Sequence, residues 1–153
     1  MKLRPLTPKD AAACYGVFYH AVHEGTAAHY SLEQRRAWAP SQTPPEDWSR
    51  RLCEGFAICA TRWGKLVGFF TMGHDGHIDF AYVLPKEMRK GTAGRLYEAC
   101  ERHARQQGLR LLTTEASHLA LRFFEKHGWK PVAKQVVIRQ GVGIENTRME
   151  KHL

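Results

Sequence analysis

The stretch from Val83 to Leu96, VLPKEMRKGTAGRL, constrains the fold of this chain more than any other segment. An apolar strand pattern ends at Pro85, and a basic turn containing Gly91 and Gly94 leads directly into a helical pattern. Such a connection directs backbone N–H groups toward one point at the start of the helix, where a phosphate can bind. The glycines can also serve only a tight connection, and this alternative stays open on the loop alone because short glycine patterns are weak signals.

Hydrophobic periodicity predicts a single α/β domain over residues 1–153. With 43% hydrophobic and 25% charged residues, the chain has enough apolar side chains for a core, which excludes intrinsic disorder. We expect a mixed central sheet of about six to seven strands flanked by helices. The predicted order is a strand at 2–6, helices at 11–25, 31–39 and 44–54, strands at 56–62, 65–73 and 77–84, a helix at 92–107, a strand at 109–114, a helix at 117–128, and a hairpin of 130–139 with 144–151.

The sequence carries no pattern typical of membrane insertion or secretion. The longest apolar runs, 11–19 and 66–73, reach about half of the roughly 18 to 20 residues that a membrane span needs. Pro5 and Pro8 stand where a signal peptide would place its apolar stretch. We therefore predict a cytoplasmic protein with no membrane partner.

Cysteine spacing and net charge narrow the functional classes further. The cysteines at 14, 53, 59 and 100 form no C-x-x-C pair and no zinc-finger spacing, so we predict neither a disulfide scaffold nor a metal site. The formal net charge of +8 favours an anionic partner, either nucleic acid or a phosphate-rich small molecule. Because the basic residues are scattered and no nucleic-acid-binding module is recognisable, we rank nucleic acid last.

Several motifs together resemble one enzyme family. VLPKEMRKGTAG resembles the V-x-P-x-x-[QR]-x-x-G-x-[GA] signature of the GNAT N-acetyltransferases, and ASHLALRFFEKHGWKPV looks like the second motif of that family. HIDFAYVLP, TTEAS and the closing ENTRMEKHL are similar to a YafP-like branch of GNAT proteins. The predicted element order matches the family over the whole chain.

The resemblance implies acetyl-coenzyme A as cosubstrate, bound in a cleft between splayed strands. Its pyrophosphate would lie on the basic turn, and its pantetheine arm would pair with backbone groups of the preceding strand. Ser117 could contact this arm, although a helix-capping role alone would explain it. The implied cofactor contacts are Tyr82, Val83, Arg89, Lys90, Gly91, Thr92, Ala93, Gly94, Arg95, Ser117 and Phe124.

The sequence departs from the family pattern at two positions. Met88 stands where the family usually has Gln or Arg, but a backbone cradle does not depend on that side chain. Phe124 stands where many members carry a Tyr proposed to protonate the departing thiolate, and a phenyl ring cannot donate a proton. We therefore predict a different acid or direct protonation by solvent.

Acetyl transfer to an amine needs a group that accepts a proton, because an alkylammonium with a pKa of about 10.4 is protonated at pH 7. Alternation predicts His77 and Asp79 on one face of their strand with Ala81, opposite Ile78, Phe80 and Tyr82. Either residue can act as general base, with Asp79 slightly favoured, or the two can simply pair with each other. Glu115 is a third candidate; its alternative role is to stabilise the next helix N-terminus.

On the acceptor side, the family usually builds its cleft from the two early helices and the final hairpin. The implied candidates are His20, His23, Glu24, Tyr30 and Trp38, with a core role as the alternative for Trp38. No cysteine lies in a motif that activates a thiolate, which favours direct attack in a ternary complex over a covalent route.

We therefore predict an N-acetyltransferase that acts on an amine, with a small molecule as the expected acceptor. A homodimer is one alternative for its oligomeric state. The first alternative is a coenzyme A-binding or sensing module without turnover, motivated by Met88 and Phe124. A protein N-acetyltransferase and a basic nucleic-acid binder follow as further alternatives.

Overall fold

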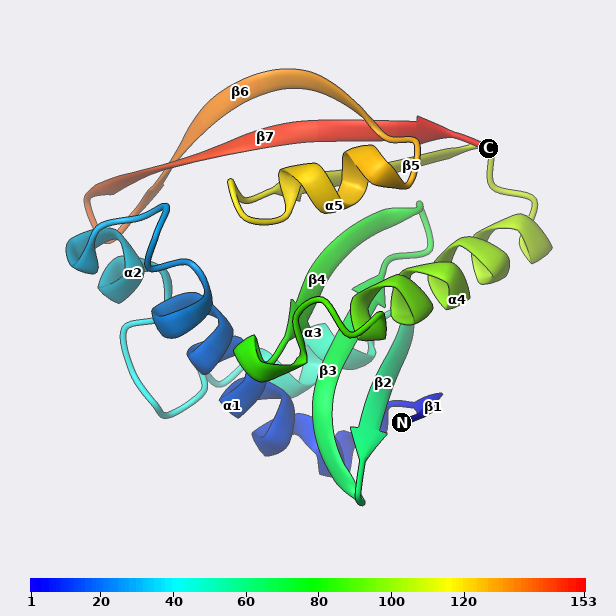
Figure 1. Cartoon of the computed structure of the whole chain (residues 1–153), viewed down its shortest axis with the longest axis horizontal. Helices are drawn as coiled ribbons and strands as arrows, with labels where there is room; N and C mark the ends of the chain where they lie inside the picture. Colours follow the sequence, from blue (N-terminus) through cyan, green and yellow to red (C-terminus); the bar gives the residue numbers. More distant parts are fainter.

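Seven strands form one mixed sheet in the computed structural model, which describes residues 1–153 (Figure 1). The strand order is β1-β2-β3-β4-β5-β7-β6, and every neighbouring pair is antiparallel except β4 with β5. This arrangement confirms the predicted α/β domain with a mixed sheet. The strands are β1 Lys2–Pro5, β2 Phe56–Arg62, β3 Lys65–Met72, β4 His77–Val83, β5 Leu111–Ala116, β6 Lys130–Arg139 and β7 Val142–His152.

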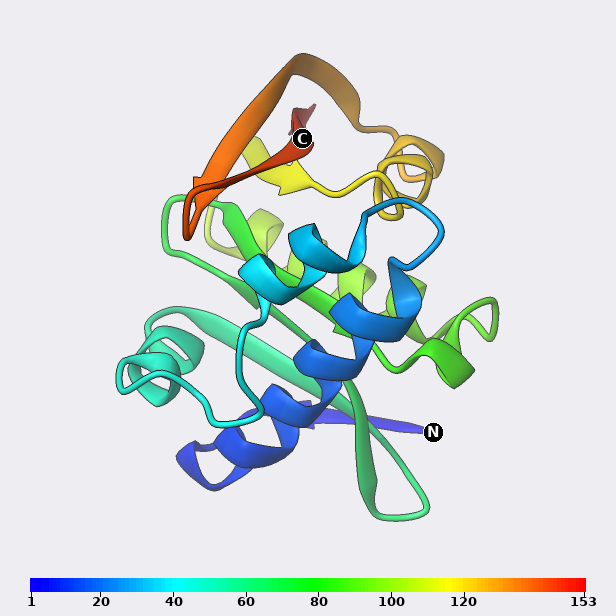
Figure 2. The ribbon, with the colours of Figure 1, turned by 90° about the vertical axis from the view of Figure 1, so that its left-hand side faces the viewer.

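The helices lie on both faces of this sheet. Figures 1 and 2 show α1 and α4 on opposite sides of β3 and β4. One core cluster joins α4 to the sheet through Leu96 and Phe70, and a second joins α1 through Phe18 and Phe69. The helical segments are η1 Pro8–Asp10, α1 Ala11–His20, the π-helical η2 Ala21–Gly25, α2 Leu32–Trp38, α3 Trp48–Cys53, η3 Pro85–Glu87, α4 Thr92–Gln106 and α5 Leu121–Lys126. None of them is long and apolar enough to cross a membrane.

Two predicted helices are shorter than expected. The helix predicted at 44–54 begins only at Trp48. A turn precedes it, in which the Trp48 N–H donates a hydrogen bond to the Pro45 carbonyl. The helix predicted at 117–128 covers only Leu121–Lys126. Residues 118–120 form a separate turn before it, and the Ser117 carbonyl accepts hydrogen bonds from the N–H groups of Ala120 and Leu121. The Ser117 hydroxyl accepts a hydrogen bond of 3.2 Å from the Ala120 N–H, so Ser117 caps this preceding turn, while Ala120 is the N-cap of α5 itself.

A β-bulge interrupts the alternation predicted for β4. Thr71 of β3 pairs with Phe80 and Met72 pairs with Ile78, which leaves Asp79 as the extra residue. Ile78 consequently joins the core cluster on the α4 side, whereas Phe80 joins the cluster on the α1 side. The prediction that Ile78, Phe80 and Tyr82 share one face is therefore wrong at Ile78, because one inserted residue reverses the alternation.

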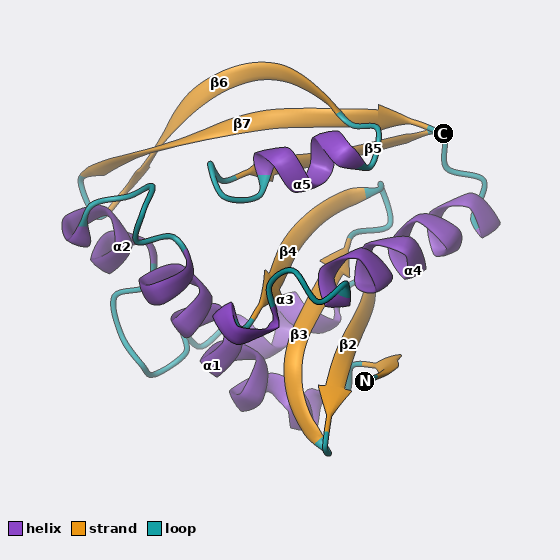
Figure 3. Ribbon diagram, viewed as in Figure 1, coloured by secondary structure: helices purple, strands orange, loops and turns teal.

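The sheet opens between its two parallel strands. β4 and β5 pair only at His77 with Thr113 and Ile78 with Thr114, and beyond this point they diverge. The backbone edge of β4 from Asp79 to Val83 therefore has no strand partner on the β5 side. This divergence confirms the predicted splayed cleft. Figure 3 shows how β4 continues through one helical turn and a short loop, drawn in teal, into α4.

At the N-terminus, we expect Asp10→Asn to destabilise the protein by about 1 kcal/mol near neutral pH. The Asp10 carboxylate accepts two hydrogen bonds from Arg4, at 2.8 and 2.9 Å, and one from the Thr7 backbone N–H. The Arg4 hydrogen bonds lower the pKa of Asp10 to about 2, below the value of about 3.9 in an unfolded chain. The contribution of the ionised Asp10 carboxylate to stability is therefore present above about pH 4 and is lost as the pH falls toward 2. Urea unfolding at several pH values measures the free energy of unfolding of the wild type and of Asp10→Asn. The difference between the two should shrink below pH 4, and a difference that stays constant would contradict the prediction.

Candidate active site

Two cavities meet where β4 and β5 separate. The loop cavity, about 270 Å³, lies beside the β4–α4 connection and is bordered by Met88, Arg89 and Gly91 together with Phe123 and Phe124 of α5. The hairpin cavity, about 350 Å³, lies on the other side of the opening, between the α1–α3 region and the β6–β7 hairpin. Both cavities are bordered by Trp38, Tyr82 and Ser117. A ligand that extends from one cavity can therefore reach the other past these three residues.

The start of α4 can hold an anion in the loop cavity. Gly91 is the N-cap, with φ +83°, and no side chain caps the helix there. The N–H groups of the first helical turn have no partner inside the helix and carry the positive end of its dipole. A Cβ placed on Gly91 would meet no atom within 4 Å, so the space beside this N-cap residue is open. Arg89, with φ +65°, adds positive charge at the cavity border.

Not every residue predicted in this loop presents its side chain to the cavity. Arg89, Gly91, Ala93 and Gly94 border it, as do Tyr82 and Val83 of β4. The Thr92 side chain is fully buried in the protein, Lys90 pairs with Glu87, and the Arg95 guanidinium lies 3.9 Å from the Met1 sulfur. These three residues therefore border neither cavity: Thr92 is buried, whereas Lys90 and Arg95 are exposed outside the cavity lining.

Glu87 was missed by the sequence reasoning. Its side chain is 1% exposed and borders the loop cavity. Arg62 of β2 donates a hydrogen bond of 2.8 Å to Glu87 Oε1, and Lys90 Nζ lies 3.4 Å from Oε2. Burial raises the pKa of this carboxyl group, but Arg62 and Lys90 outweigh burial and hold it below its usual value. In the sequence, Glu87 stands among basic residues and is indistinguishable from a solvated surface charge.

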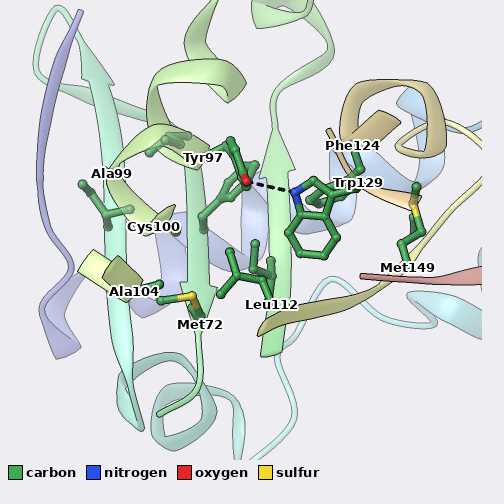
Figure 4. Close-up of a cluster of buried hydrophobic side chains, with 14 of the residues drawn as sticks. Met72, Tyr97, Ala99, Cys100, Ala104, Leu112, Phe124, Trp129 and Met149 are labelled. Carbon is green, nitrogen blue, oxygen red and sulfur yellow. Dashed lines mark hydrogen bonds between the residues drawn. The ribbon is translucent and has the colours of Figure 1, made fainter. Parts of the chain in front are cut away.

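Phe124 borders the loop cavity and belongs to a cluster of buried side chains that includes Tyr97 and Trp129 (Figure 4). It is 1% exposed and contacts Tyr97 and Trp129 edge-on. The Tyr97 hydroxyl accepts a hydrogen bond of 2.9 Å from the Trp129 indole and donates one of 2.6 Å to Glu101. Burial and this hydrogen bond to Glu101 raise the pKa of Tyr97, which borders neither cavity. Tyr97 therefore does not replace the missing Tyr at position 124.

All three predicted base candidates border the hairpin cavity. His77 Nδ1 lies 2.8 Å from the Thr113 hydroxyl, and Asp79 accepts from Arg51 at 3.2 Å. His77 and Asp79 thus have separate partners, and the alternative that they pair with each other is not seen. Asp79 and Glu115 directly follow the last pair of β4 and β5, so they flank the opening from opposite strands.

The acceptor candidates divide into two groups. Tyr30 and Trp38 border the hairpin cavity. The Tyr30 hydroxyl donates to the Glu145 carbonyl at 2.6 Å, which ties α2 and its preceding loop to β7. His20, His23 and Glu24 border neither cavity. This departs from the prediction: His20 Nδ1 lies 3.0 Å from the Glu24 carboxylate on the surface, and His23 Nε2 lies 2.7 Å from the Ala39 carbonyl oxygen.

Further polar residues of the hairpin cavity were not predicted. Arg51 borders it from α3 with its guanidinium 4.9 Å above the Phe80 ring, and Arg139 borders it from the end of β6. Asn146 of β7 also borders it, and its buried Oδ1 accepts no hydrogen bond within the chain. These residues come together only through packing of α3 and the final hairpin against β4. The closing segment ENTRMEKHL, which contains Asn146, resembles the YafP-like branch, but the spacing of its residues does not indicate a cavity.

Comparison with known proteins agrees with this geometry. The sequence profile of the acetyltransferase (GNAT) domain matches residues 26–153. The chain is 29% identical over 149 residues to the uncharacterized N-acetyltransferase YafP of Escherichia coli (strain K12), covering 97% of this chain and 94% of YafP.

Solved structures agree as well. A GCN5-related N-acetyltransferase from Rhodopseudomonas palustris superposes with a TM-score of 0.94 at 34% identity, covering 99% of this chain and 95% of that one. YncA from Salmonella typhimurium, solved with acetyl-CoA, shares the fold with a TM-score of 0.69 at 20% identity, over 99% of this chain and 93% of YncA. By its sequence profile, its relatives and its fold, the chain belongs to the GNAT family of N-acetyltransferases.

Proposed function

We propose that this protein transfers an acetyl group from acetyl-coenzyme A to an amine of a small molecule, by direct attack in a ternary complex. The observation that carries the proposal is the meeting of an anion-binding loop cavity with a polar hairpin cavity at the opening between β4 and β5. A donor and an acceptor bound on opposite sides of Trp38, Tyr82 and Ser117 would bring their reacting groups together there.

The residues of the loop cavity suit a coenzyme A thioester. The first-turn N–H groups of α4 and the Arg89 guanidinium would bind the pyrophosphate. The open edge of β4 at Tyr82 and Val83 offers backbone groups to the amides of an extended arm, in the manner of an added strand. When bound, this cosubstrate supplies an acetyl group already activated as a thioester.

The hairpin cavity supplies groups that can accept the proton of the acceptor amine. An alkylammonium must lose a proton before its nitrogen can attack, and Asp79, His77 and Glu115 all border the cavity in which it would bind. Asp79 and Glu115 flank the opening itself, whereas His77 lies where β4 still pairs with β5. The position of the opening therefore favours the two carboxylates over His77.

The size of the hairpin cavity supports a small acceptor. Its volume of about 350 Å³ lies at the lower end of the roughly 300 to 1,000 Å³ typical of small-molecule sites. A screen of amines with acetyl-coenzyme A, read as release of free thiol and as mass of the acetylated product, tests the proposal. Binding of acetyl-coenzyme A without thiol release from any amine would instead support the sensing module. Acetylation of peptides but of no small amine would support a protein acceptor.

We expect Phe124→Tyr to leave kcat nearly unchanged or to lower it. A coenzyme A thiol ionises near the pKa of about 8.5 typical of a cysteine thiol, so it can depart as thiolate near neutral pH without a donor from the protein. A hydroxyl at position 124 would also have to fit on a side chain that is 1% exposed and packed against Trp129. Steady-state kinetics with circular dichroism as the folding control tests this. A large rise in kcat would show instead that protonation of the leaving group limits turnover.

A further inference from the structure

We infer that Glu87 is a positioning residue for the diphosphate of the cosubstrate, held by Arg62, and that this pair makes the protein select coenzyme A thioesters over truncated thioesters without phosphate. The inference rests on the proposed function, because it concerns how the loop cavity holds the same cosubstrate. It assigns a role to the side chains of Glu87 and Arg62, in addition to the backbone N–H groups and glycines of the loop.

A fully buried carboxylate in an anion-binding loop needs a reason. Glu87 is 1% exposed, and a buried carboxylate is costly unless it is paired. Glu87 is paired with two cations, Arg62 at 2.8 Å and Lys90 at 3.4 Å. With Arg89 at the cavity border, the group keeps a net positive charge. Glu87 therefore fixes cations in place without making the loop repel a phosphate.

The backbone of the loop also needs an external restraint. Arg89 has φ +65°, a left-handed conformation that is unfavourable for a residue with a Cβ. Gly91, two residues later, is left-handed as well. Arg62 is the last residue of β2, so its hydrogen bond to Glu87 ties the start of this loop to the rigid sheet. Fixing the loop there orients the N–H groups of the first turn of α4.

One oxygen of Glu87 is left without a hydrogen bond. Oε2 is buried and accepts none within the chain, although Lys90 Nζ lies 3.4 Å away. The half-exposed Lys90 ammonium can thus approach either Oε2 or an anion in front of α4. Glu87 therefore limits how far this ammonium moves from the phosphate position.

The test compares acetyl-coenzyme A with S-acetylpantetheine, which keeps the thioester arm and lacks the phosphates. For Glu87→Gln we expect kcat/KM with acetyl-coenzyme A to fall about 10- to 100-fold, while kcat/KM with S-acetylpantetheine stays within about twofold. Arg62→Gln changes the other partner of the ion pair, which is more exposed than Glu87. It should also lower the ratio of kcat/KM with acetyl-coenzyme A to kcat/KM with S-acetylpantetheine. The amine acceptor is the one found in the wild-type screen, held at saturation.

Glu101→Gln is the matched control. Glu101 lies on α4, accepts hydrogen bonds from Lys151 and Tyr97, and borders neither cavity. It should lower the melting temperature without changing the ratio between the two thioesters. If Glu87→Gln and Arg62→Gln weaken both thioesters equally, or neither, the inference is overturned while the proposed function stands. If the wild-type protein neither binds acetyl-coenzyme A nor releases its thiol, the proposed function itself fails, and the inference with it.

Discussion

Gly91→Val is expected to weaken acetyl-coenzyme A binding by about 100-fold while the protein remains folded. The substituted side chain would fill the open space beside the N-cap of α4 and hinder the proposed approach of the pyrophosphate to the first-turn N–H groups. Loss of about two hydrogen bonds to a charged group, at roughly 1.5 kcal/mol each, corresponds to that factor. Isothermal titration measures the affinity, and thermal unfolding measures the stability.

Gly108→Val separates the loss of binding from the loss of stability. Gly108 lies just beyond the opposite end of α4, has φ +76°, and a Cβ there also meets no atom within 4 Å. Both substitutions therefore impose a similar left-handed strain, which should lower the melting temperature by a few degrees in each variant. Only Gly91→Val should lose affinity. Equal affinity in all three proteins would mean that the loop is only a connection.

Local patterns predicted most of the fold because they depend on neighbours in the chain. The strand, basic turn and helix from 83 to 96 follow from Pro85, the two glycines and the helical apolar stripe, and all three are present. Ser31 was expected to open a helix, and its hydroxyl accepts from the Gln34 N–H at 3.1 Å in a reciprocal capping box. Such signals involve a few consecutive residues, so one sequence suffices to recognise them.

Features that depend on packing between distant segments were not predictable. The bulge at Asp79 follows from the register of β3 against β4, and Thr71 supports it by accepting a hydrogen bond from the Phe80 N–H at 3.1 Å. Arg62 and Glu87 are 25 residues apart and meet only when β2 lies beside the loop. His20 and Glu24 were implied by a family resemblance, but they form an exposed pair outside both cavities.

Asp79→Asn is expected to lower kcat/KM by about 100-fold or more and to leave the affinity for acetyl-coenzyme A nearly unchanged. The bulge places Asp79 at the opening, and Arg51 holds its carboxylate at 3.2 Å beside the hairpin cavity. An amide of the same shape keeps a hydrogen bond with Arg51 but cannot accept the proton of the amine. The readouts are kcat/KM with a saturating cosubstrate and the dissociation constant of acetyl-coenzyme A.

The pH dependence distinguishes a general base from a residue that only shapes the cavity. If Asp79 accepts the proton, the fall in kcat/KM at acidic pH should flatten in Asp79→Asn, because the group that titrates there is gone. Glu54→Gln is the control: Glu54 pairs with Arg50 beside α3 and borders neither cavity, so its profile should match the wild type. The opposite result is an unchanged fall of kcat/KM at acidic pH in Asp79→Asn and a flattened one in Glu115→Gln. It would show that Glu115, on the other side of the opening, accepts the proton.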